Sequence, residues 1–443
     1  MKIHFISIGG SIMHNLALAL QDNGHQVSGS DDLIYDPARS RLEAKGLLPS
    51  EFGWFPDQIS SDLDLIILGM HAKADNPELM RAQGLALPIH SFPSFVAEYA
   101  KDKKKVVVAG SHGKTTTTSM IMHCLNVNQI DHDYLVGAQL EGYENMVRLS
   151  DAALMIIEGD EYLSSAIDRS PKFLHYKADL WIITGIAWDH INVFKTFEDY
   201  KKQFDLLLKS IPKTKKVFID GKDEGLVKLT EDCDNRIEKY YPFKHEEGAI
   251  IFNGNKYPIS VFGEHNMSNL NAAYQVCREL GVSEKQFFDA MISFKGAAKR
   301  QQLVVVNKTQ KVFWDFAHAP SKVKATVKAF VEKFANEKIA VVVELHTYSS
   351  LNKKFLPHYK NSLEGVEEAA VFFNPKNLEI KKMEPLESEF IKDSFNYSEL
   401  NILQKPTEMK AFLANLSSNF EGIVLIMSSG QLGAVQLTEI FGN

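Results

Sequence analysis

The stretch "VVVAGSHGKTTTTSM", residues 106–120, joins an apolar run to a segment of Gly, Lys and Thr. The apolar run predicts a buried strand, and the spacing of the apolar residues over 120–125 predicts a helix after it. Glycines between a strand and a helix let main-chain N–H groups face a phosphate, toward which the helix directs its positive end. We therefore predict a phosphate-binding loop in the compact form G-x-x-G-K-T, because Val108 stands where the usual pattern has its first glycine. Lys114 would contact the terminal phosphates and Thr115 would bind Mg²⁺. A glycine-rich turn with a chance lysine is the alternative.

Strand-like and helix-like segments alternate along most of the chain, which predicts parallel sheets covered by helices. "KIHFISI", Gly9-Gly10 and "HNLALALQDNG" form a Rossmann-like beginning, although Ser7 and Ile12 replace two glycines of the usual fingerprint. "IAVVVEL", "AAVFFNP" and "GIVLIMSSG" predict a second such domain near the C-terminus. We predict an α/β protein of three domains. They are an N-terminal Rossmann-like domain over 1–102, a central P-loop ATPase-like parallel sheet over 103–299, and a C-terminal Rossmann-like domain over 300–443. The basic run "KDKKK", residues 101–105, predicts a solvated linker, and hinges are expected near 101–105 and 297–301.

Bulk composition excludes several classes of protein. The chain has 443 residues, of which 45% are hydrophobic and 24% charged, as in soluble globular proteins. A net charge of −7 argues against a general nucleic-acid binder. No apolar run reaches the roughly 18 residues of a membrane span. Three widely spaced cysteines match neither a disulfide framework nor a metal site, which favours a cytoplasmic location.

Charged residues follow two further apolar runs. In "IIEGDEY" the best placed residue for a metal is Glu158, since carboxylates at the end of a buried strand need a compensating cation. A solvated acidic loop is the alternative. In "GIAWDHINVF" His190 is equally compatible with a metal ligand and with a hydrogen-bonded structural residue. "TFEDYKKQFDLLLKSI" predicts a helix with Thr196 as N-cap and Asp199 at the capping-box position.

Six motifs in order resemble the Mur ligase family across the whole chain: "GSHGKTT", "EGDE", "WDH", "GEHNMSNLNA" at 263–272, "FKGAAKR" at 294–300 and "WDFAHAP" at 314–320. The resemblance implies ATP-dependent ligation of amino acids or peptides to a UDP-muramoyl carboxylate, with Mg²⁺. It implies catalytic roles for Lys114, Glu158 and His190, and metal binding by Thr115, Glu158 and His190. The residues that it implies for ATP are Gly110, Ser111, His112, Gly113, Lys114, Thr115, Thr116, Asn266, Asn269, Arg300, Asp315 and His318. Those that it implies for the UDP group are Gly9, Gly10, Ser11, Asp31 and His71.

Two reactions compete within the family. "RSPKFLHY", "YDPARS" and "GEHNMSN" favour ligation of the tripeptide L-Ala-γ-D-Glu-meso-diaminopimelate to UDP-N-acetylmuramate, and ligation of L-alanine is the second possibility. A nucleotide-dependent switch without ligation is the rival from another class. A monomer or weak homo-oligomer is expected, with no nucleic acid or membrane as partner.

Two positions and one stretch depart from the family pattern. Phe204 stands where many members carry a lysine, which favours the two reactions above. His346, in "ELHTYSS", replaces an arginine near the incoming amine, and "MSSGQLG" departs from its expected glycine-rich form. We expect His346 to contact the amine substrate.

Overall fold

The computed structural model describes residues 1–140, 142–188, 191, 193–231, 233, 236–246, 248–297, 300–430 and 432–442. The chain forms two compact units. The first comprises Met1–Ile186, Lys201–Tyr241 and Ala272–Ala290, and the second comprises Ala187–Tyr200, Pro242–Asn271 and Met291–Asn443. None of the helices in the described part of the chain combines the length and hydropathy needed to cross a bilayer.

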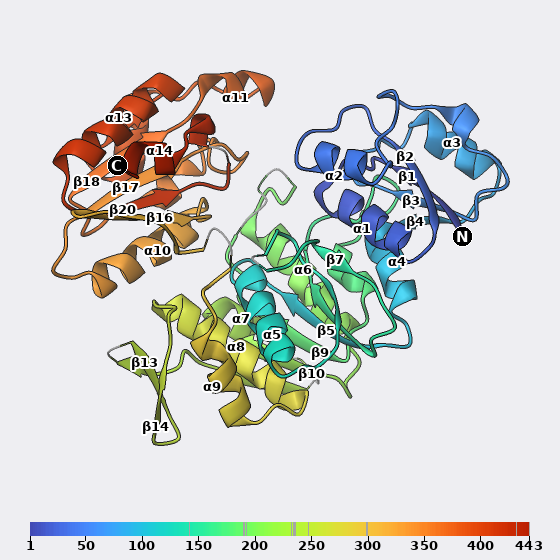
Figure 1. Ribbon diagram of the computed structural model, residues 1–443, viewed down its shortest axis with the longest axis horizontal. Coiled ribbons are helices and arrows are strands. Elements are labelled where there is room, and N and C mark those ends of the chain that lie inside the picture. Colours follow the sequence, from blue (N-terminus) through green and yellow to red (C-terminus); the bar gives the residue numbers. More distant parts are fainter. Residues whose placement is uncertain are drawn as a thin grey trace. The chain divides into compact units, whose positions relative to one another are not determined.

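The N-terminal sheet has four parallel strands in the order β2-β1-β3-β4 (Figure 1). Its strands are β1 (Lys2–Ile6), β2 (Gln26–Ser30), β3 (Leu65–Leu68) and β4 (Ile89–Ser91). The helices of this part of the chain are α1 (Ser11–Asp22), α2 (Ala38–Ala44), η1 (Pro56–Gln58), α3 (Pro77–Gly84) and α4 (Phe92–Tyr99). All four residues of β3 are buried. Such continuous apolar strands are typical of parallel sheets that are covered on both faces.

The central sheet has seven strands in the order β11-β10-β9-β5-β8-β6-β7, and only β7 is antiparallel to its neighbour. Its strands are β5 (Lys104–Ala109), β6 (Asp133–Leu135), β7 (Val147–Arg148), β8 (Leu154–Glu158), β9 (Leu180–Ile183), β10 (Lys216–Asp220) and β11 (Arg236–Tyr240). The helices between and after these strands are α5 (Lys114–Val127), η2 (Lys172–His175), α6 (Phe197–Ser210), α7 (Glu224–Leu229), α8 (Glu264–Glu279) and α9 (Glu284–Ile292). Because β5 lies between β9 and β8, three parallel strands end side by side next to the predicted phosphate loop.

The C-terminal sheet has six strands in the order β15-β16-β20-β17-β18-β19, and β15 alone runs antiparallel. Its strands are β15 (Gln302–Val306), β16 (Gln310–Asp315), β17 (Ile339–Glu344), β18 (Glu368–Phe372), β19 (Asn401–Leu403) and β20 (Gly422–Met427). The helices here are α10 (Pro320–Lys333), η3 (Leu356–Tyr359), α11 (Pro375–Ile380), α12 (Ser388–Phe395), α13 (Pro406–Asn419), η4 (Leu432–Ala434) and α14 (Leu437–Phe441). A separate antiparallel sheet contains β12 (His245–Glu246), β13 (Ala249–Phe252) and β14 (Asn255–Pro258).

Alternation along β17 builds a core on each face of the C-terminal sheet. Val341 and Val343 pack with residues of α10, η3 and α12. Ala340 and Val342 pack with residues of α13 and α14 on the other face. Successive side chains of a strand point to opposite faces, so one apolar strand supplies both cores.

The predicted fold class is confirmed, with parallel sheets in the N-terminal, central and C-terminal parts of the chain. The capping box of α6 is confirmed as well, because the Asp199 main-chain N–H donates to Thr196 Oγ1 at 3.1 Å and the Thr196 N–H donates back to the Asp199 carboxylate at 3.2 Å. The limits of the three domains stay a prediction.

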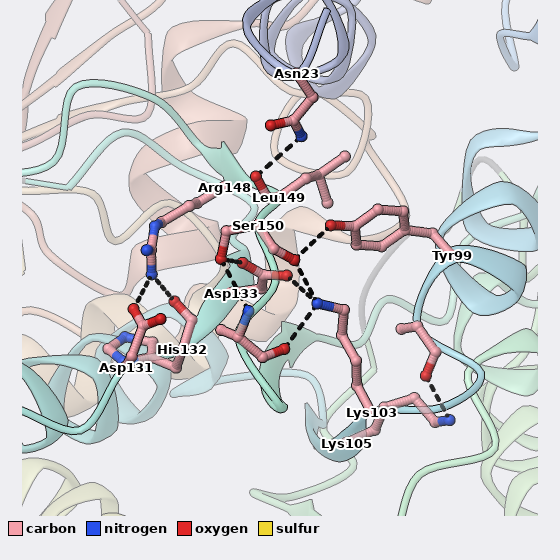
Figure 2. Close-up of polar contacts among 12 residues, drawn as sticks. Asn23, Tyr99, Lys103, Lys105, Asp131, His132, Asp133, Arg148, Leu149 and Ser150 are labelled. Atoms are coloured by element: carbon pink, nitrogen blue, oxygen red, sulfur yellow. Dashed lines mark hydrogen bonds and ion pairs between the residues drawn. The ribbon is translucent and has the colours of Figure 1, made fainter. Parts of the chain in front are cut away.

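The basic run at 101–105 is solvated only in part, because Lys101, Asp102 and Lys104 are exposed whereas Lys103 and Lys105 are not. Lys103 Nζ lies 2.8 Å from the carboxylate of Asp133 and donates to the main-chain oxygens of Ser150 and Ala152 at 2.6 and 2.7 Å (Figure 2). Only 13% of the Lys103 side chain and none of the Asp133 side chain is exposed. The run lies within the first unit, where this buried ion pair fixes it.

Two more contacts join the N-terminal part of the chain to the same region. Tyr99 donates to the Ser150 oxygen at 2.8 Å, and Asn23 Nδ2 donates to the Leu149 oxygen at 3.0 Å (Figure 2). Lys105 is buried, and its ammonium donates to the Ala100 oxygen at 3.0 Å, at the C-terminal end of α4. The lysines therefore hold carbonyl groups and a carboxylate that burial would otherwise leave without partners.

Candidate active site

The predicted phosphate loop connects β5 to α5, and its conformation depends on two glycines. Gly110 has φ of 127° and Gly113 has φ of 78°, values that favour glycine. A Cβ atom at Gly110 would lie 2.3 Å from Thr184 Oγ1, so no side chain fits there. The Ser111 N–H donates to the Gly185 oxygen at 2.9 Å, which holds the loop against the end of β9. The loop is thus built by close main-chain packing.

Lys114 is the first residue of α5 and lies among carboxylates. Its ammonium is 3.0 Å from Glu161 Oε2 and donates to the Gly110 oxygen. Burial opposes the charged form, but Glu161, Asp160 and Glu158 outweigh it and raise the pKa of Lys114. Lys114 is therefore a fixed positive charge beside the loop. Glu161 has no exposed surface, and the sequence did not single it out as the partner of Lys114.

Thr115 and Glu158 lie in contact, as their predicted shared role requires. Thr115 Oγ1 donates to Glu158 Oε1 at 3.0 Å, and Glu158 Oε2 accepts from the Gly137 N–H at 3.0 Å. Glu158 ends β8 and lies beside Val108 in the register of β5 and β8. The pairing of two strands thus brings together residues that are 43 positions apart in sequence.

His190 lies outside the described residues, as does Asp189. The predicted role of His190 as a metal ligand therefore stays a prediction.

The N-terminal glycine turn lies at the carboxyl end of β1. The Gly9 N–H donates to Asp31 Oδ2 at 2.8 Å, and Gly10 is the N-cap of α1, which Ser11 begins. A Cβ atom at Gly9 would lie 3.0 Å from the same carboxylate oxygen. Ser7, the residue in place of a glycine, has φ of 69° and so adopts the conformation that glycine favours. The turn therefore keeps its backbone course despite the substitution.

Asp31 is buried beside this turn. Burial, assisted by the neighbouring Asp32, raises the pKa of the Asp31 carboxyl to about 6. His71, by contrast, is exposed three residues after the end of β3. Within the described part of the chain, the structure records no hydrogen bond between His71 and the Gly9–Asp31 pair, so its predicted role depends on the family resemblance alone.

The second unit groups most of its predicted ATP residues in one network. Asn266, in the first turn of α8, donates to Gln301 Oε1 at 3.0 Å. The Gln301 N–H donates to Asp315 Oδ2 at 2.8 Å, and the other carboxylate oxygen accepts from the Ala317 N–H at 2.7 Å. Gln301 was not predicted as a site residue, although it follows the predicted Arg300 directly. Its φ of 48° and its buried Nε2, for which no hydrogen bond to another described residue is recorded, would have been visible only in three dimensions.

Arg300 and His318 flank Phe316 in the same network. The Arg300 guanidinium lies 4.4 Å from the centroid of the Phe316 ring, and His318 Nδ1 lies 2.9 Å from the Phe316 oxygen. Asn269 is buried three residues after Asn266 on α8. Polar side chains from α8, β16 and the turn after β16 thus converge.

His346 follows β17 by two residues and is half-buried. Burial lowers the pKa of His346, and Lys381 lowers it further, against the opposing effect of Glu344. Burial and Lys381 therefore favour the neutral imidazole.

The chain is similar in sequence and fold to known proteins. The model described as "Mur ligase family, catalytic domain" matches residues 2–104, and the model described as "Mur ligase middle domain" matches residues 108–277. The UDP-N-acetylmuramate–L-alanine ligase of Sulfurihydrogenibium is 30% identical over 367 residues, which cover 80% of this chain and 78% of the relative. The chain belongs to the Mur ligase family. Members of this family are ATP-dependent carboxylate–amine ligases.

Two solved structures of the family share the fold. The murein peptide ligase of Psychrobacter arcticus has a TM-score of 0.68 at 22% identity, covering 100% of this chain and 99% of that chain. The UDP-N-acetylmuramate–alanine ligase of Thermotoga maritima has a TM-score of 0.71 at 22% identity, covering 100% and 98%. Both likenesses show the same overall fold for this Mur ligase.

The donor atoms beside the Mur ligase phosphate loop suit Mg²⁺. Thr115 Oγ1 and the Glu158 carboxylate are hard oxygen donors 3.0 Å apart. Among the described residues no group of three or more His, Cys, Asp or Glu side chains could hold a metal ion by itself. The Thr115 and Glu158 oxygens fit Mg²⁺, which is usually bound by one or two protein oxygens together with substrate phosphates and water.

Proposed function

We propose that this Mur ligase joins the tripeptide L-Ala-γ-D-Glu-meso-diaminopimelate to the carboxylate of UDP-N-acetylmuramate, with ATP as energy source. The observation that carries the ligase assignment is the convergence of Lys114, Thr115 and Glu158 on one glycine loop. The motifs "RSPKFLHY", "YDPARS" and "GEHNMSN" support the tripeptide as the amine substrate.

In the first step, a carboxylate oxygen of the muramic acid attacks the γ-phosphorus of ATP, and ADP leaves. The product is an acyl phosphate, which is a far better acyl donor than a carboxylate. The Lys114 ammonium and the loop N–H groups counter the negative charge of the phosphoryl group in transfer. Mg²⁺, held by Thr115 and Glu158, would neutralise phosphate charge when bound. Glu161 orients Lys114 through the 3.0 Å contact.

In the second step, the substrate amine attacks the activated carbonyl carbon. The tetrahedral intermediate loses phosphate, the nitrogen loses its proton, and an amide remains. Asp31 and the Gly9–Gly10 turn would hold the uridine part of the acyl donor, because in Rossmann-like folds a carboxylate about 20 residues after the glycine turn accepts hydrogen bonds from ribose hydroxyls. Asn266, Arg300, Asp315 and His318 would contact the nucleotide that supplies the phosphoryl group.

L-Alanine is the second candidate for the amine substrate. The curated relatives support it, because the Sulfurihydrogenibium relative at 30% identity is an L-alanine ligase by name.

One assay separates the candidates. The full chain is incubated with ATP, Mg²⁺ and UDP-N-acetylmuramate, each amine is offered separately, and phosphate release is measured, with Lys114→Met as the inactive control. We expect release with the tripeptide at least ~10-fold faster than with L-alanine, since 1.4 kcal/mol of extra transition-state binding gives that factor. Release with L-alanine alone would establish the second candidate. Hydrolysis of ATP that the muramoyl nucleotide leaves unchanged would indicate a nucleotide switch.

A further inference from the structure

Asn15 is a buried polar residue in the second turn of α1, the helix that follows the N-terminal glycine turn. Its side-chain nitrogen donates to the Ser11 oxygen at 2.8 Å and to His14 Nε2 at 2.9 Å. Its side-chain oxygen accepts from the Met146 N–H at 2.9 Å and from the Arg41 guanidinium at 3.2 Å. These bonds occupy both donors and both lone pairs of the amide. The side chain is therefore held in one orientation, with α1 on its nitrogen side and Met146 on its oxygen side.

The nitrogen side of Asn15 fixes the glycine turn. His14 Nδ1 lies 2.9 Å from the Gly10 oxygen, which can only accept a hydrogen bond, so the imidazole proton is on Nδ1 and Nε2 accepts from Asn15. Burial lowers the pKa of His14, and Arg41 lowers it further, against the effect of the Gly10 hydrogen bond, so the neutral form that this arrangement requires is favoured. Asn15 thus holds the first turn of α1 directly and, through His14, the carbonyl of the N-cap residue.

The oxygen side of Asn15 fixes the connection between β6 and β7. Met146, which donates its N–H to Asn15, accepts from the Val136 N–H at 2.9 Å through its own main-chain oxygen. Gly137 follows directly and donates its N–H to the Glu158 carboxylate at 3.0 Å. A Cβ atom at Gly137 would lie 2.8 Å from Glu158 Oε1, so the main chain here lies against the carboxylate that we propose for Mg²⁺. A short series of hydrogen bonds and peptide units therefore runs from the glycine turn to Glu158.

Arg41 and Ser11 strengthen the same link. The half-buried Arg41, in α2, donates to Gln139 Oε1 at 3.0 Å and to the Glu144 oxygen at 3.1 Å, both in the β6–β7 connection. The Ser11 hydroxyl donates to Met146 Sδ at 3.6 Å. All of these residues belong to the first unit, so the link joins helices of the N-terminal sheet to the central sheet within one compact unit. Buried polar networks in which every group has a partner rigidify the part of the fold that they connect.

We propose that Asn15 is a positioning residue for the ligation reaction, because it fixes the spacing between the glycine turn and the Glu158 carboxylate. This inference rests on the proposed function, in which the turn holds the UDP-muramoyl substrate and Glu158 lies at the phosphates of ATP. The muramoyl oxygen and the γ-phosphorus must be aligned when the oxygen attacks, and the spacing of the two sites sets that alignment. A misplacement of ~1 Å between reacting groups can cost ~100-fold in rate.

The test compares Asn15→Leu with Asn23→Leu in the full chain. Asn23 is the matched control, because its side chain also joins α1 to the central sheet, through the Leu149 oxygen at 3.0 Å, but from the opposite end of the helix (Figure 2). We expect kcat for phosphate release with the productive amine to fall about 10-fold or more in Asn15→Leu and less than ~2-fold in Asn23→Leu.

Binding measurements separate alignment from folding. Asn15→Leu is titrated in a calorimeter with UDP-N-acetylmuramate and, separately, with Mg²⁺ and the non-hydrolysable analogue AMPPCP. It should keep the wild-type stoichiometry, with dissociation constants within ~3-fold, because each site by itself is retained. Arg41→Met is the second variant, which removes the three Arg41 contacts from a half-buried position. We expect its kcat to fall about 5-fold with binding equally retained.

The outcomes are distinct. An Asn15→Leu protein that binds both ligands and turns over within ~2-fold of the wild type would overturn this inference and leave the proposed function intact, as would an unchanged kcat in Arg41→Met. A stoichiometry that falls in proportion to kcat in both variants would show that the network only maintains the folded state, which also contradicts the positioning role. A wild type that releases no phosphate with any amine would overturn the proposed function, and this inference with it.

Discussion

At the scale of single residues, Ser7 combines two unfavourable features. Its φ of 69° is a conformation that costs a non-glycine residue about 1–2 kcal/mol, and no hydrogen bond is recorded for its buried hydroxyl within the described residues. Replacement by glycine relieves the strain at a cost of about 0.5–1 kcal/mol in unfolded-chain entropy. We expect Ser7→Gly to be roughly 0.5–1 kcal/mol more stable than Ser7→Ala in urea unfolding. Ser7→Ala is the control because it removes the same hydroxyl but keeps Cβ, and equal stabilities would show that the backbone is unstrained.

Asp31 predicts a pH dependence of stability. Burial raises its pKa to about 6, above the value of about 3.9 for an unfolded chain. The folded state therefore holds a proton that the unfolded state releases, and the free energy of unfolding falls as pH rises from about 4 through 6. We expect Asp31→Asn to be more stable than the wild type above pH 6, with the difference shrinking toward pH 4.5, as measured by urea unfolding. The variant should also lose affinity for UDP-N-acetylmuramate. A stability difference between Asp31→Asn and the wild type that does not vary with pH would contradict the raised pKa of Asp31.

Lys114 and Glu161 give a paired prediction for activity. Lys114→Met removes the charge beside the transferring phosphoryl group, so kcat for phosphate release should fall at least ~10³-fold, toward the upper range for loss of one preorganised charged group. Glu161→Gln keeps the ammonium and loosens its orientation, so we expect a smaller loss of about 10-fold. Equal losses in both variants would show that Glu161 does more than orient Lys114.

At the scale of elements, the ion pair between the 101–105 segment and β6 should contribute strongly to stability. Lys103→Met leaves the fully buried Asp133 carboxylate without its cation, which costs about 3 kcal/mol. Lys104→Met, at the exposed neighbouring position, should change the free energy of unfolding by less than about 0.5 kcal/mol. Thermal and urea unfolding of both variants measure this difference, and similar stabilities would mean that the pair contributes nothing net.

At the scale of the whole molecule, the residues proposed to bind ATP come from segments far apart in the sequence, such as Lys114 and Thr115 on the one hand and Arg300 and Asp315 on the other. The proposed role of Arg300 in nucleotide binding predicts that Arg300→Met raises KM for ATP about 10-fold, the size of one lost charge-assisted contact. Arg278→Met, at a half-exposed position of α8, is the control and should leave KM for ATP unchanged. An unchanged KM in Arg300→Met would remove Arg300 from the nucleotide site.

The sequence by itself determined the fold class and the strand–glycine turn–helix course at 106–120, because both depend on local patterns. Apolar runs such as 106–109 form strands wherever they are buried, and a Gly-x-x-Gly-Lys-Thr segment between strand and helix has one common use. The carboxylate facing Thr115 was also predictable, since Glu158 ends an apolar run.

Only the tertiary structure decided which distant groups meet. Strand order and register determine which of three nearby acids pairs with Lys114. They also bury Lys103 against Asp133 and bring Gln301 beside Asp315. The same holds for Asn15, whose partner Met146 lies in the β6–β7 connection of the central sheet. The sequence specifies the chemistry of each side chain. Ion pairs and hydrogen bonds, however, act over about 3 Å, and only the folded sheet sets distances on that scale.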